Sequence, residues 1–154
     1  HRDLKPMNVL IDENYHPHIS GFTLCTEYVE GQELSEICGS GYYMAPEVFD
    51  GSYDFKADVY SFSILLFEVV TGQNAFLDAR SLFQLQKLIK DGYRPEFKSP
   101  VKISIQTLIE RSWSEDPDER PDFEEIYNKL AFDDEYLLDN VDKEKLNSYI
   151  DSIK

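Results

Sequence analysis

The chain has 154 residues, a length that suits one domain with a sizeable core. Its 15 basic and 30 acidic residues give a formal net charge of -15, which disfavours nucleic acid and anionic membranes as partners. A hydrophobic content of 42% argues against disorder, and no apolar run approaches the roughly 20 residues of a membrane-spanning helix.

The two cysteines, Cys25 and Cys38, show neither a CxxC motif nor Cys/His ligand spacing, so a structural zinc site is not expected. We expect two free thiols in a reducing compartment, and therefore a cytoplasmic protein. Because the sequence begins at His1 rather than at a methionine, we expect the natural N-terminus to lie upstream.

The first third of the chain predicts a β-hairpin followed by a long loop. Residues 8–11 and 18–20 favour short strands, and the polar residues 12–16 between them favour a turn. Residues 21–41 are polar, carry scattered glycines and show no hydrophobic period, which predicts a loop. Loops of this length inside a compact domain are usually functional.

Helical patterns dominate the rest of the chain. Residues 57–72 are apolar nearly all round and end at a glycine, which predicts a buried central helix. A second helix is expected over residues 79–92, with Asp78 as its N-cap and Gly92 as its stop. A third pattern covers residues 103–113, where four apolar side chains share one face: Ile105, Leu108, Ile109 and Trp113.

Two more helices are expected near the C-terminus. Asp122 followed by Glu125 has the spacing of a capping box and predicts the start of the fourth helix. The tail contains a last helical pattern, whose apolar residues are Leu146, Tyr149, Ile150 and Ile153. We expect this apolar face to pack within the chain, with binding to a partner helix as the alternative. These elements predict an α+β fold that is mostly helical, with a short β-hairpin near the N-terminus.

The opening sequence HRDLKPMNVL carries the first chemical signal, because Asn8 follows Asp3 at the distance Asp-x-x-x-x-Asn. It resembles the catalytic loop of protein kinases. By that resemblance Asp3 accepts the hydroxyl proton of a substrate, and Asn8 holds Mg²⁺ against the phosphates of ATP. Lys5 would lie beside the transferred phosphoryl group, as in serine/threonine kinases.

Later motifs resemble the same family in the expected order. Residues 45–47, Ala-Pro-Glu, resemble the motif that closes the kinase activation segment, and residues 57–72 resemble the central helix of the large lobe. The resemblance implies that Asp58 binds the backbone of the catalytic loop. It also implies a buried ion pair between Arg120 and Glu47, and breaking such a pair costs about 3–5 kcal/mol.

The resemblance covers residues 1–131 and is closest to the tyrosine-kinase-like group of serine/threonine kinases. It implies that residues 1–131 form the large, C-terminal lobe of a kinase-like domain, and we expect residues 132–154 to form an acidic, helical tail. His1, Arg2 and Phe22 would be scaffold residues. Four hydroxyl side chains of the long loop are candidates for phosphorylation, with Arg2 as the partner of the new charge: Thr26, Tyr28, Ser35 and Ser40.

One motif departs from the family pattern. The long loop of an active kinase begins with Asp-Phe-Gly, but aligning Phe22 with the phenylalanine places Gly21 at the aspartate and Thr23 at the glycine. That aspartate is the main charged ligand of Mg²⁺, and the neutral amide of Asn8 is a poor substitute. If the lost ligand is worth about 4 kcal/mol, the rate falls on the order of a thousandfold.

Nearby acids do not replace the missing carboxylate. Asp12 and Glu13 lie in the predicted turn, and Glu27 is six residues into the loop. No glycine-rich phosphate loop, strand lysine or partner glutamate of a small lobe matches this sequence. We therefore expect this chain alone to bind no ATP, and we expect some apolar surface of the central helix to be uncovered.

Three hypotheses remain. The first is a pseudokinase, which keeps the kinase fold to bind or regulate other proteins while Asp3, Lys5 and Asn8 are relics. The second is an active serine/threonine kinase that uses ATP and Mg²⁺ and has its small lobe upstream. The third is a non-functional gene fragment or a sequencing error at Gly21.

Overall fold

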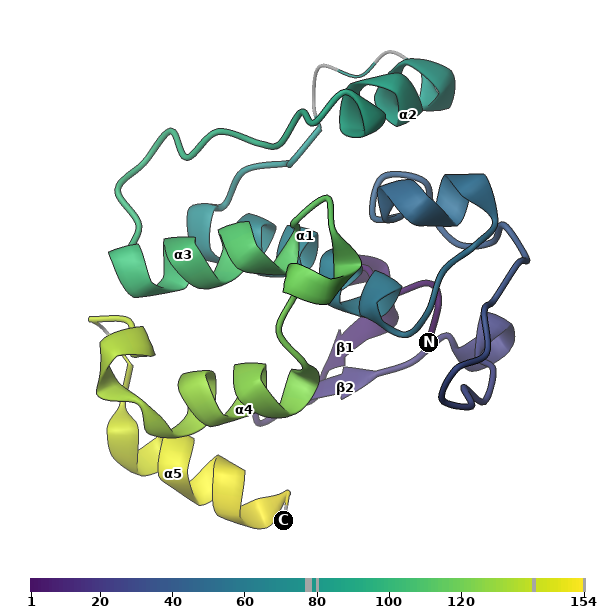
Figure 1. Ribbon diagram of the computed structural model, residues 1–154. Coiled ribbons are helices and arrows are strands. Elements are labelled where there is room, and N and C mark those ends of the chain that lie inside the picture. Colours follow the sequence, from purple (N-terminus) through teal and green to yellow (C-terminus); the bar gives the residue numbers. More distant parts are fainter. Residues whose placement is uncertain (77–78, 80, 140, 154) are drawn as a thin grey trace.

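The computed structural model describes residues 1–76, 79, 81–139 and 141–153 (Figure 1). Within these residues, five α-helices and one two-stranded sheet are formed, which gives the predicted α+β, mostly helical fold. Their bounds are β1 Val9–Ile11, β2 Pro17–Ile19, α1 Lys56–Thr71, α2 Leu82–Lys90, α3 Ile103–Ser112, α4 Phe123–Phe132 and α5 Lys143–Ser152.

The predicted hairpin is confirmed. Strands β1 and β2 pair antiparallel, with Val9 opposite Ile19. Asp12 closes the turn between them, because its carboxylate accepts the backbone N–H groups of Asn14 and His16, each at 2.8 Å. This side chain-to-backbone bonding is the usual reason for an aspartate at a turn.

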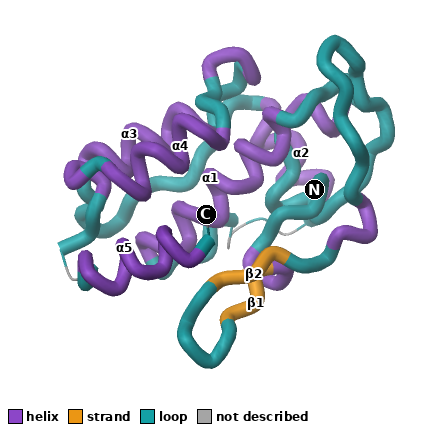
Figure 2. Tube along the Cα trace, turned by 90° about the horizontal axis from the view of Figure 1, so that it is seen from below, coloured by secondary structure: helices purple, strands orange, loops and turns teal. Residues whose placement is uncertain are grey.

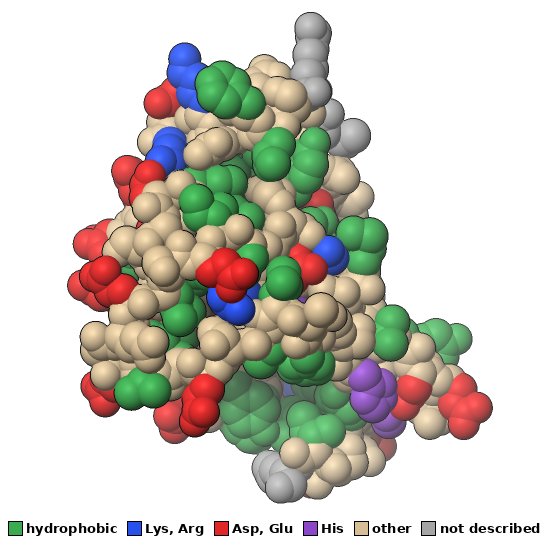
Figure 3. Space-filling view, turned by 90° about the vertical axis from the view of Figure 1, so that its right-hand side faces the viewer, with side chains coloured by type: hydrophobic (Ala, Val, Ile, Leu, Met, Phe, Trp, Pro, Cys, Tyr) green, Lys and Arg blue, Asp and Glu red, His purple; other side chains and the backbone are tan. Residues whose placement is uncertain are grey.

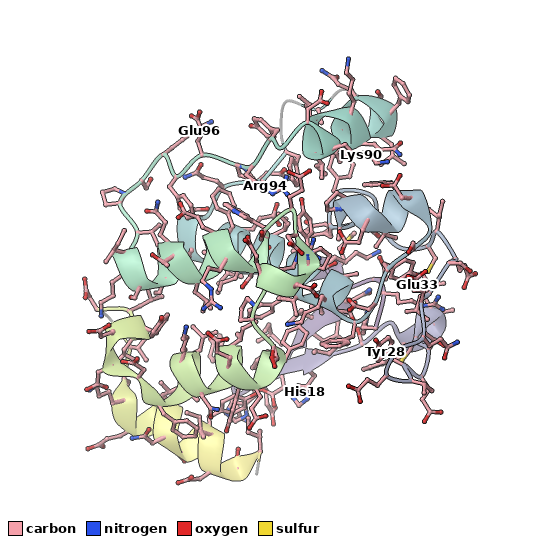
Figure 4. The ribbon with its side chains drawn as sticks, in the orientation of Figure 1. His18, Tyr28, Glu33, Lys90, Arg94 and Glu96 are labelled. Atoms are coloured by element: carbon pink, nitrogen blue, oxygen red, sulfur yellow. The ribbon has the colours of Figure 1, made fainter. Side chains whose placement is uncertain are left out.

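The loop that follows the hairpin is tied to residues 52–55, at the start of α1. Leu34 and Tyr53 exchange backbone hydrogen bonds of 2.8 and 3.1 Å, which form an isolated bridge. The ring of Tyr28 packs edge-on against Phe55 at 5.2 Å, on the same side of the molecule as Glu33 (Figure 4). The loop therefore follows a defined path although it contains little regular structure.

Helix α1 is the centre of the fold, as its apolar sequence predicts (Figure 2). It ends where Gly72 adopts a left-handed conformation with φ 66°, which a glycine reaches without steric cost. The core joins α1 to α2 and α3 through side chains that are buried in all three helices. These residues are Tyr60, Ile64, Phe67, Leu85, Ile89, Ile105, Ile109 and the adjoining Trp113.

The predicted start of the second helix is wrong. Helix α2 begins at Leu82, and its N-cap is Ser81, whose hydroxyl accepts the N–H of Gln84 at 3.2 Å. Ser81 has extended backbone angles, so the helix does not reach back to residue 79. The expected N-cap, Asp78, lies outside the described residues.

The predicted capping box is also wrong. Asp122 is the N-cap of α4, but its side chain makes no capping hydrogen bond. Glu125 instead forms ion pairs with Arg111 of α3 and Lys129 of α4, both at 2.7 Å. Two cationic partners attract this carboxylate more strongly than a single backbone N–H does.

The tail forms the predicted helix and packs within the chain. Figure 1 shows α5 running beside α4, and Ile150 is only 4% exposed. The ring of Tyr149 stacks on His16 of the hairpin turn with centroids 4.6 Å apart. Ile153 departs from the prediction, because it is 55% exposed. The helices of the described part of the chain include none that is long and apolar enough to span a bilayer.

Candidate active site

The hairpin brings Asn8 and Gly21 together. Asn8 ends a 3₁₀ turn just before β1, and Gly21 lies two residues after the end of β2. Ser20 joins the two strand ends, because its N–H and its hydroxyl both donate to the carbonyl of Asn8, at 2.8 and 3.1 Å. A Cβ atom placed on Gly21 would lie only 2.6 Å from Cγ of Asn8. The amide of Asn8 thus occupies the space beside the position of the missing carboxylate.

Asp3, Lys5 and Asn8 form one hydrogen-bonded cluster. Lys5 Nζ lies 2.8 Å from the Asp3 carboxylate, and Asn8 Nδ2 donates to the Asp3 carbonyl at 2.7 Å. Asn8 Nδ2 also lies 3.3 Å from Oδ2 of Asp3. The structure therefore places the three predicted catalytic residues side by side.

Ser40 completes this cluster from the far end of the long loop. Its hydroxyl accepts a hydrogen bond from Lys5 Nζ at 2.5 Å. The sequence interpretation treats Ser40 only as a candidate for phosphorylation, because a partner 35 residues away leaves no local pattern. Lys5 therefore links the Asp3 carboxylate to the end of the loop.

The electrostatics of Asp3 favour its charged form. Partial burial raises the pKa of Asp3, but hydrogen bonds and charge from Lys5, together with hydrogen bonds from Ser40 and Asn8, outweigh this effect and hold the pKa below its ordinary value. Its Oδ1 is shielded from solvent and has no hydrogen-bond partner among the described residues. An unpaired carboxylate oxygen of this kind can accept a proton or contact a cation.

Side chains of the central helix and of the first residues form the scaffold around this cluster. The carboxylate of Asp58 in α1 accepts hydrogen bonds from the backbone nitrogens of His1 and Arg2, at 2.6 and 2.8 Å. His1 Nε2 lies 2.8 Å from the Ser20 carbonyl, and the His1 ring meets Phe22 edge-on at 4.9 Å. These contacts fix the cluster relative to the hairpin and the central helix.

Arg2 and Arg120 hold the loop at two other points. Arg2 donates to the carbonyl of Leu24 at 2.6 Å and pairs with Glu36 at 3.1 Å. Arg120 is 1% exposed and forms a two-pronged ion pair with Glu47, at 2.5 and 2.9 Å. The ion pair between Arg120 and Glu47 joins the segment just before α4 to residues 45–47, at the end of the long loop.

Tyr43 attaches the end of the long loop to α1, a role that the sequence does not indicate. Its hydroxyl donates to Glu68 of α1 at 2.9 Å, and its carbonyl accepts the hydroxyl of Ser61 at 2.7 Å. Burial, followed by the hydrogen bond to Glu68, raises the pKa of Tyr43 well above its ordinary value. Tyr43 therefore serves as a neutral donor that ties the loop to the central helix.

The donor set of the site fits Mg²⁺ poorly. Mg²⁺ is normally bound through one or two carboxylates together with phosphate oxygens. Here Gly21 supplies no side chain, and Asp12 is engaged in the hairpin turn with the N–H groups of Asn14 and His16. No group of three or more His, Cys, Asp and Glu residues within the described ranges is arranged to hold a metal ion. The Asp3 carboxylate beside Asn8 is the remaining acidic donor of the cluster.

Comparison with known proteins agrees with this fold. The protein kinase domain family matches residues 1–132, so the chain belongs to the protein kinase family. The sequence is 34% identical over 131 residues to serine/threonine-protein kinase STY46 of Arabidopsis thaliana, covering 84% of this chain and 23% of that protein. It is 36% identical over 134 residues to the probable serine/threonine-protein kinase drkC of Dictyostelium discoideum, covering 84% and 18%.

A third relative is named as a dual specificity kinase. The chain is 34% identical over 131 residues to the dual specificity protein kinase pyk3 of Dictyostelium discoideum, covering 84% of this chain and 10% of that protein. The chain thus spans less than a quarter of the length of each of these three relatives. Proteins of this family generally use ATP and Mg²⁺.

Proposed function

We propose that this chain is the large-lobe part of a pseudokinase, in which the kinase fold serves to bind or regulate other proteins. The observation that carries the proposal is Gly21, which removes the metal-binding carboxylate directly beside Asn8. The Asn8 amide donates to the Asp3 carbonyl, so it is engaged within the cluster. Scaffold contacts such as the pair between Arg120 and Glu47 are kept.

The proposal includes a division of the chain and a location. Residues 1–131 would form the C-terminal lobe, and residues 132–154 an acidic tail. Cys25 and Cys38 are free thiols, which supports a reducing, cytoplasmic location. The partners would be proteins rather than nucleic acid, because the net charge of -15 repels polyanions.

An active serine/threonine kinase is the alternative function. The unpaired Oδ1 of Asp3 favours it, because this oxygen is suited to accept a substrate proton. Lys5, which contacts both Asp3 and Ser40, also has the position expected of a phosphate-binding lysine. Such an enzyme would need a small lobe upstream and an unusual arrangement of Mg²⁺.

Titration of the full-length protein with ATP and Mg²⁺ tests the proposal. We expect no metal-dependent thermal shift for the natural protein and a gain of such a shift for Gly21→Asp. An aspartate tolerates the left-handed conformation of Gly21, φ 79°, but its Cβ forces the Asn8 amide to rotate. Gly21→Asn is the matched control, since it adds the same bulk without the charge and should not restore metal binding.

An assay of phosphate transfer provides the result that would contradict the proposal. If the natural full-length protein transfers phosphate from ATP at a rate that Asp3→Asn abolishes, the pseudokinase assignment is wrong. A metal-dependent thermal shift of the natural protein equal to that of Gly21→Asp would also contradict it.

A further inference from the structure

The first turn of the tail is bound to the start of α3 through its backbone. Lys102, the N-cap of α3, donates from Nζ to the carbonyls of Asp134 and Leu137, at 3.2 and 2.9 Å. The hydroxyl of Ser104, also at the start of α3, donates to the carbonyl of Glu135. Figure 1 shows this segment at the left, between the start of α3 and the end of α4. Side chains of another element thus satisfy three backbone carbonyls of the tail.

Tyr136 is the apolar anchor of the same segment. Its side chain is half-buried and packs against the core at the meeting point of three helices, where the buried residues are Val59 of α1, Leu108 of α3 and Ile126 of α4. Lys129 of α4 lies over the ring, with Nζ 5.8 Å from the centroid, which is a favourable cation–π arrangement. The segment therefore inserts one aromatic side chain and offers its backbone to α3.

Such contacts are typical of peptide recognition, in which hydrogen bonds to the backbone give affinity and a pocket for one side chain gives specificity. The other side of the segment is packed loosely. A cavity of about 270 Å³ lies between the segment, the end of α4 and the start of α5, and its lining includes Leu130, Leu137 and Leu146. We call the surface that holds the segment the tail groove, and it is formed by Lys102, Ser104, Leu108, Ile126 and Lys129.

The charges of the segment and of the tail groove are complementary. Residues 133–135 are three consecutive, exposed acids. The ammonium group of Lys102 binds their backbone, and Lys129 shares the single carboxylate of Glu125 with Arg111, which leaves a net positive charge there. The chain as a whole has 30 acidic and 15 basic residues, and Figure 3 shows acidic side chains spread over the opposite face of the molecule. An acidic segment repelled by most of the protein is thus attracted to the tail groove.

We propose that the tail groove is a docking site for an acidic protein segment that contains a tyrosine, and that residues 133–137 occupy it as a ligand from the same chain. A partner with this chemistry competes with the tail, because its tyrosine replaces Tyr136 and its carbonyls bind Lys102. Displacement of the segment also loosens α5, whose Tyr149 stacks on His16 of the hairpin turn. This inference rests on the proposed protein-binding function and specifies the chemistry of one partner.

Binding of a fluorescent peptide with the sequence of residues 133–139 to the full-length protein, without nucleotide, tests the inference. Tyr136→Ser removes the anchor of the competing tail, so this variant should bind the peptide at least about tenfold more tightly than the natural protein does. In the Tyr136→Ser background, Lys102→Met should weaken binding at least about tenfold, because two carbonyls lose their donor. Lys145→Met is the matched control, since its exposed side chain on α5 lies outside the tail groove and should leave binding unchanged.

Two altered peptides separate the anchor from the charge. In one the tyrosine is replaced by serine, and in the other the three acids that precede it are replaced by lysine. Each should bind the Tyr136→Ser protein at least about tenfold more weakly than the unaltered peptide does. The inference is overturned if either altered peptide binds as well as the unaltered one, if Lys102→Met has no effect, or if the natural and Tyr136→Ser proteins bind the peptide equally.

Hydrogen exchange of the natural full-length protein decides the question even if Tyr136→Ser does not fold. The protein is labelled with ¹⁵N, so that its fragments differ in mass from the added peptide. Excess peptide should speed the exchange of the α5 amides and leave those of α1 unchanged, and unchanged α5 amides overturn the inference. A dimer of the natural protein that Tyr136→Ser dissociates in sedimentation also overturns it, because the groove then holds the tail of a second copy. Since nucleotide is absent, these outcomes are independent of the titration with ATP and Mg²⁺.

Discussion

Arg120 connects distant parts of the chain through one buried side chain. Its guanidinium binds both carboxylate oxygens of Glu47 and the carbonyls of Lys56 and Ser114. A buried charge that loses its partner keeps its desolvation cost, which makes such pairs sensitive to truncation. Arg120 therefore has a structural role, and we expect its removal to destabilise the fold that positions the site.

The first prediction concerns this ion pair. Arg120→Ala should lower the free energy of unfolding by about 3–5 kcal/mol, because it leaves Glu47 without its partner. Lys143→Ala, which removes an exposed pair with Asp134, should cost less than about 1 kcal/mol. Urea denaturation measures both values, and similar losses for the two variants would contradict the buried role of Arg120.

Asp3 gives a prediction about pH. Its pKa lies below the ordinary 3.8, because Lys5, Ser40 and Asn8 outweigh the opposing effect of burial. A lowered pKa means that the carboxylate stabilises the folded state above about pH 3.8, and that this stability is lost as the pH falls through the folded pKa. A titration followed by NMR should therefore give a value for Asp3 below 3.8.

Lys5→Met provides the control for that titration. Without the ammonium group the pKa of Asp3 should rise, and the unfolding free energy should depend more weakly on pH in the acid range. An unchanged pKa of Asp3 in Lys5→Met would show that Lys5 does not govern its ionisation.

At the scale of elements, the C-terminal tail contacts both α3 and the hairpin turn. Lys102 donates to the carbonyls of Asp134 and Leu137 at 3.2 and 2.9 Å, which fixes the start of the tail near α3. Helix α5 then returns to the hairpin turn, where Tyr149 stacks on His16. The tail therefore packs against the turn of the hairpin, whose two ends are next to Asn8 and Gly21.

A pair of isoleucines in the tail tests this packing. Ile150→Ala should lower the free energy of unfolding by about 2–5 kcal/mol, because Ile150 is 4% exposed. Ile153→Ala makes the same chemical change at a site that is 55% exposed, and should cost less than about 0.5 kcal/mol. Equal effects in urea denaturation would mean that α5 is not docked as described.

Sequence patterns succeed for elements whose signals are local. The apolar run and the glycine stop predict α1, and the turn residues with their flanking strands predict the hairpin. They fail at the start of α2, where Ser81 caps the helix, and at the capping box of α4, where Glu125 pairs with Arg111 rather than with the backbone. The second failure arises because a cation from another helix competes for the side chain, and a pattern within one helix does not contain that partner.

At the scale of the whole molecule, apolar surface and net charge have opposite effects on solubility. The net charge of -15 keeps copies of the chain apart. Several bulky residues on and beside the hairpin are nevertheless more than half exposed: Met7, Leu10, Ile11, Ile19 and Phe22. Val69 of the central helix is exposed as well, as the sequence predicts for an uncovered part of α1.

The hairpin surface leads to a prediction about association. The 154-residue chain should show light scattering that grows with concentration, and Leu10→Thr with Ile19→Thr should reduce it, because threonine keeps the β propensity while removing apolar area. Ile103→Thr, at an exposed site on α3, should have little effect. If the hairpin variant scatters as much light as the natural chain, the chains associate through a surface other than the hairpin.

The sequence by itself determines the family and the local elements. The spacing from Asp3 to Asn8 and the apolar helix ending at Gly72 are local patterns, and Gly21 stands out because intact motifs surround it. Only the tertiary structure decides that the Asn8 amide lies against Gly21, that Lys5 binds Ser40 and that the tail stacks on His16. These contacts join residues far apart in the chain, and their energies depend on burial and on competing partners that the folded state alone brings together.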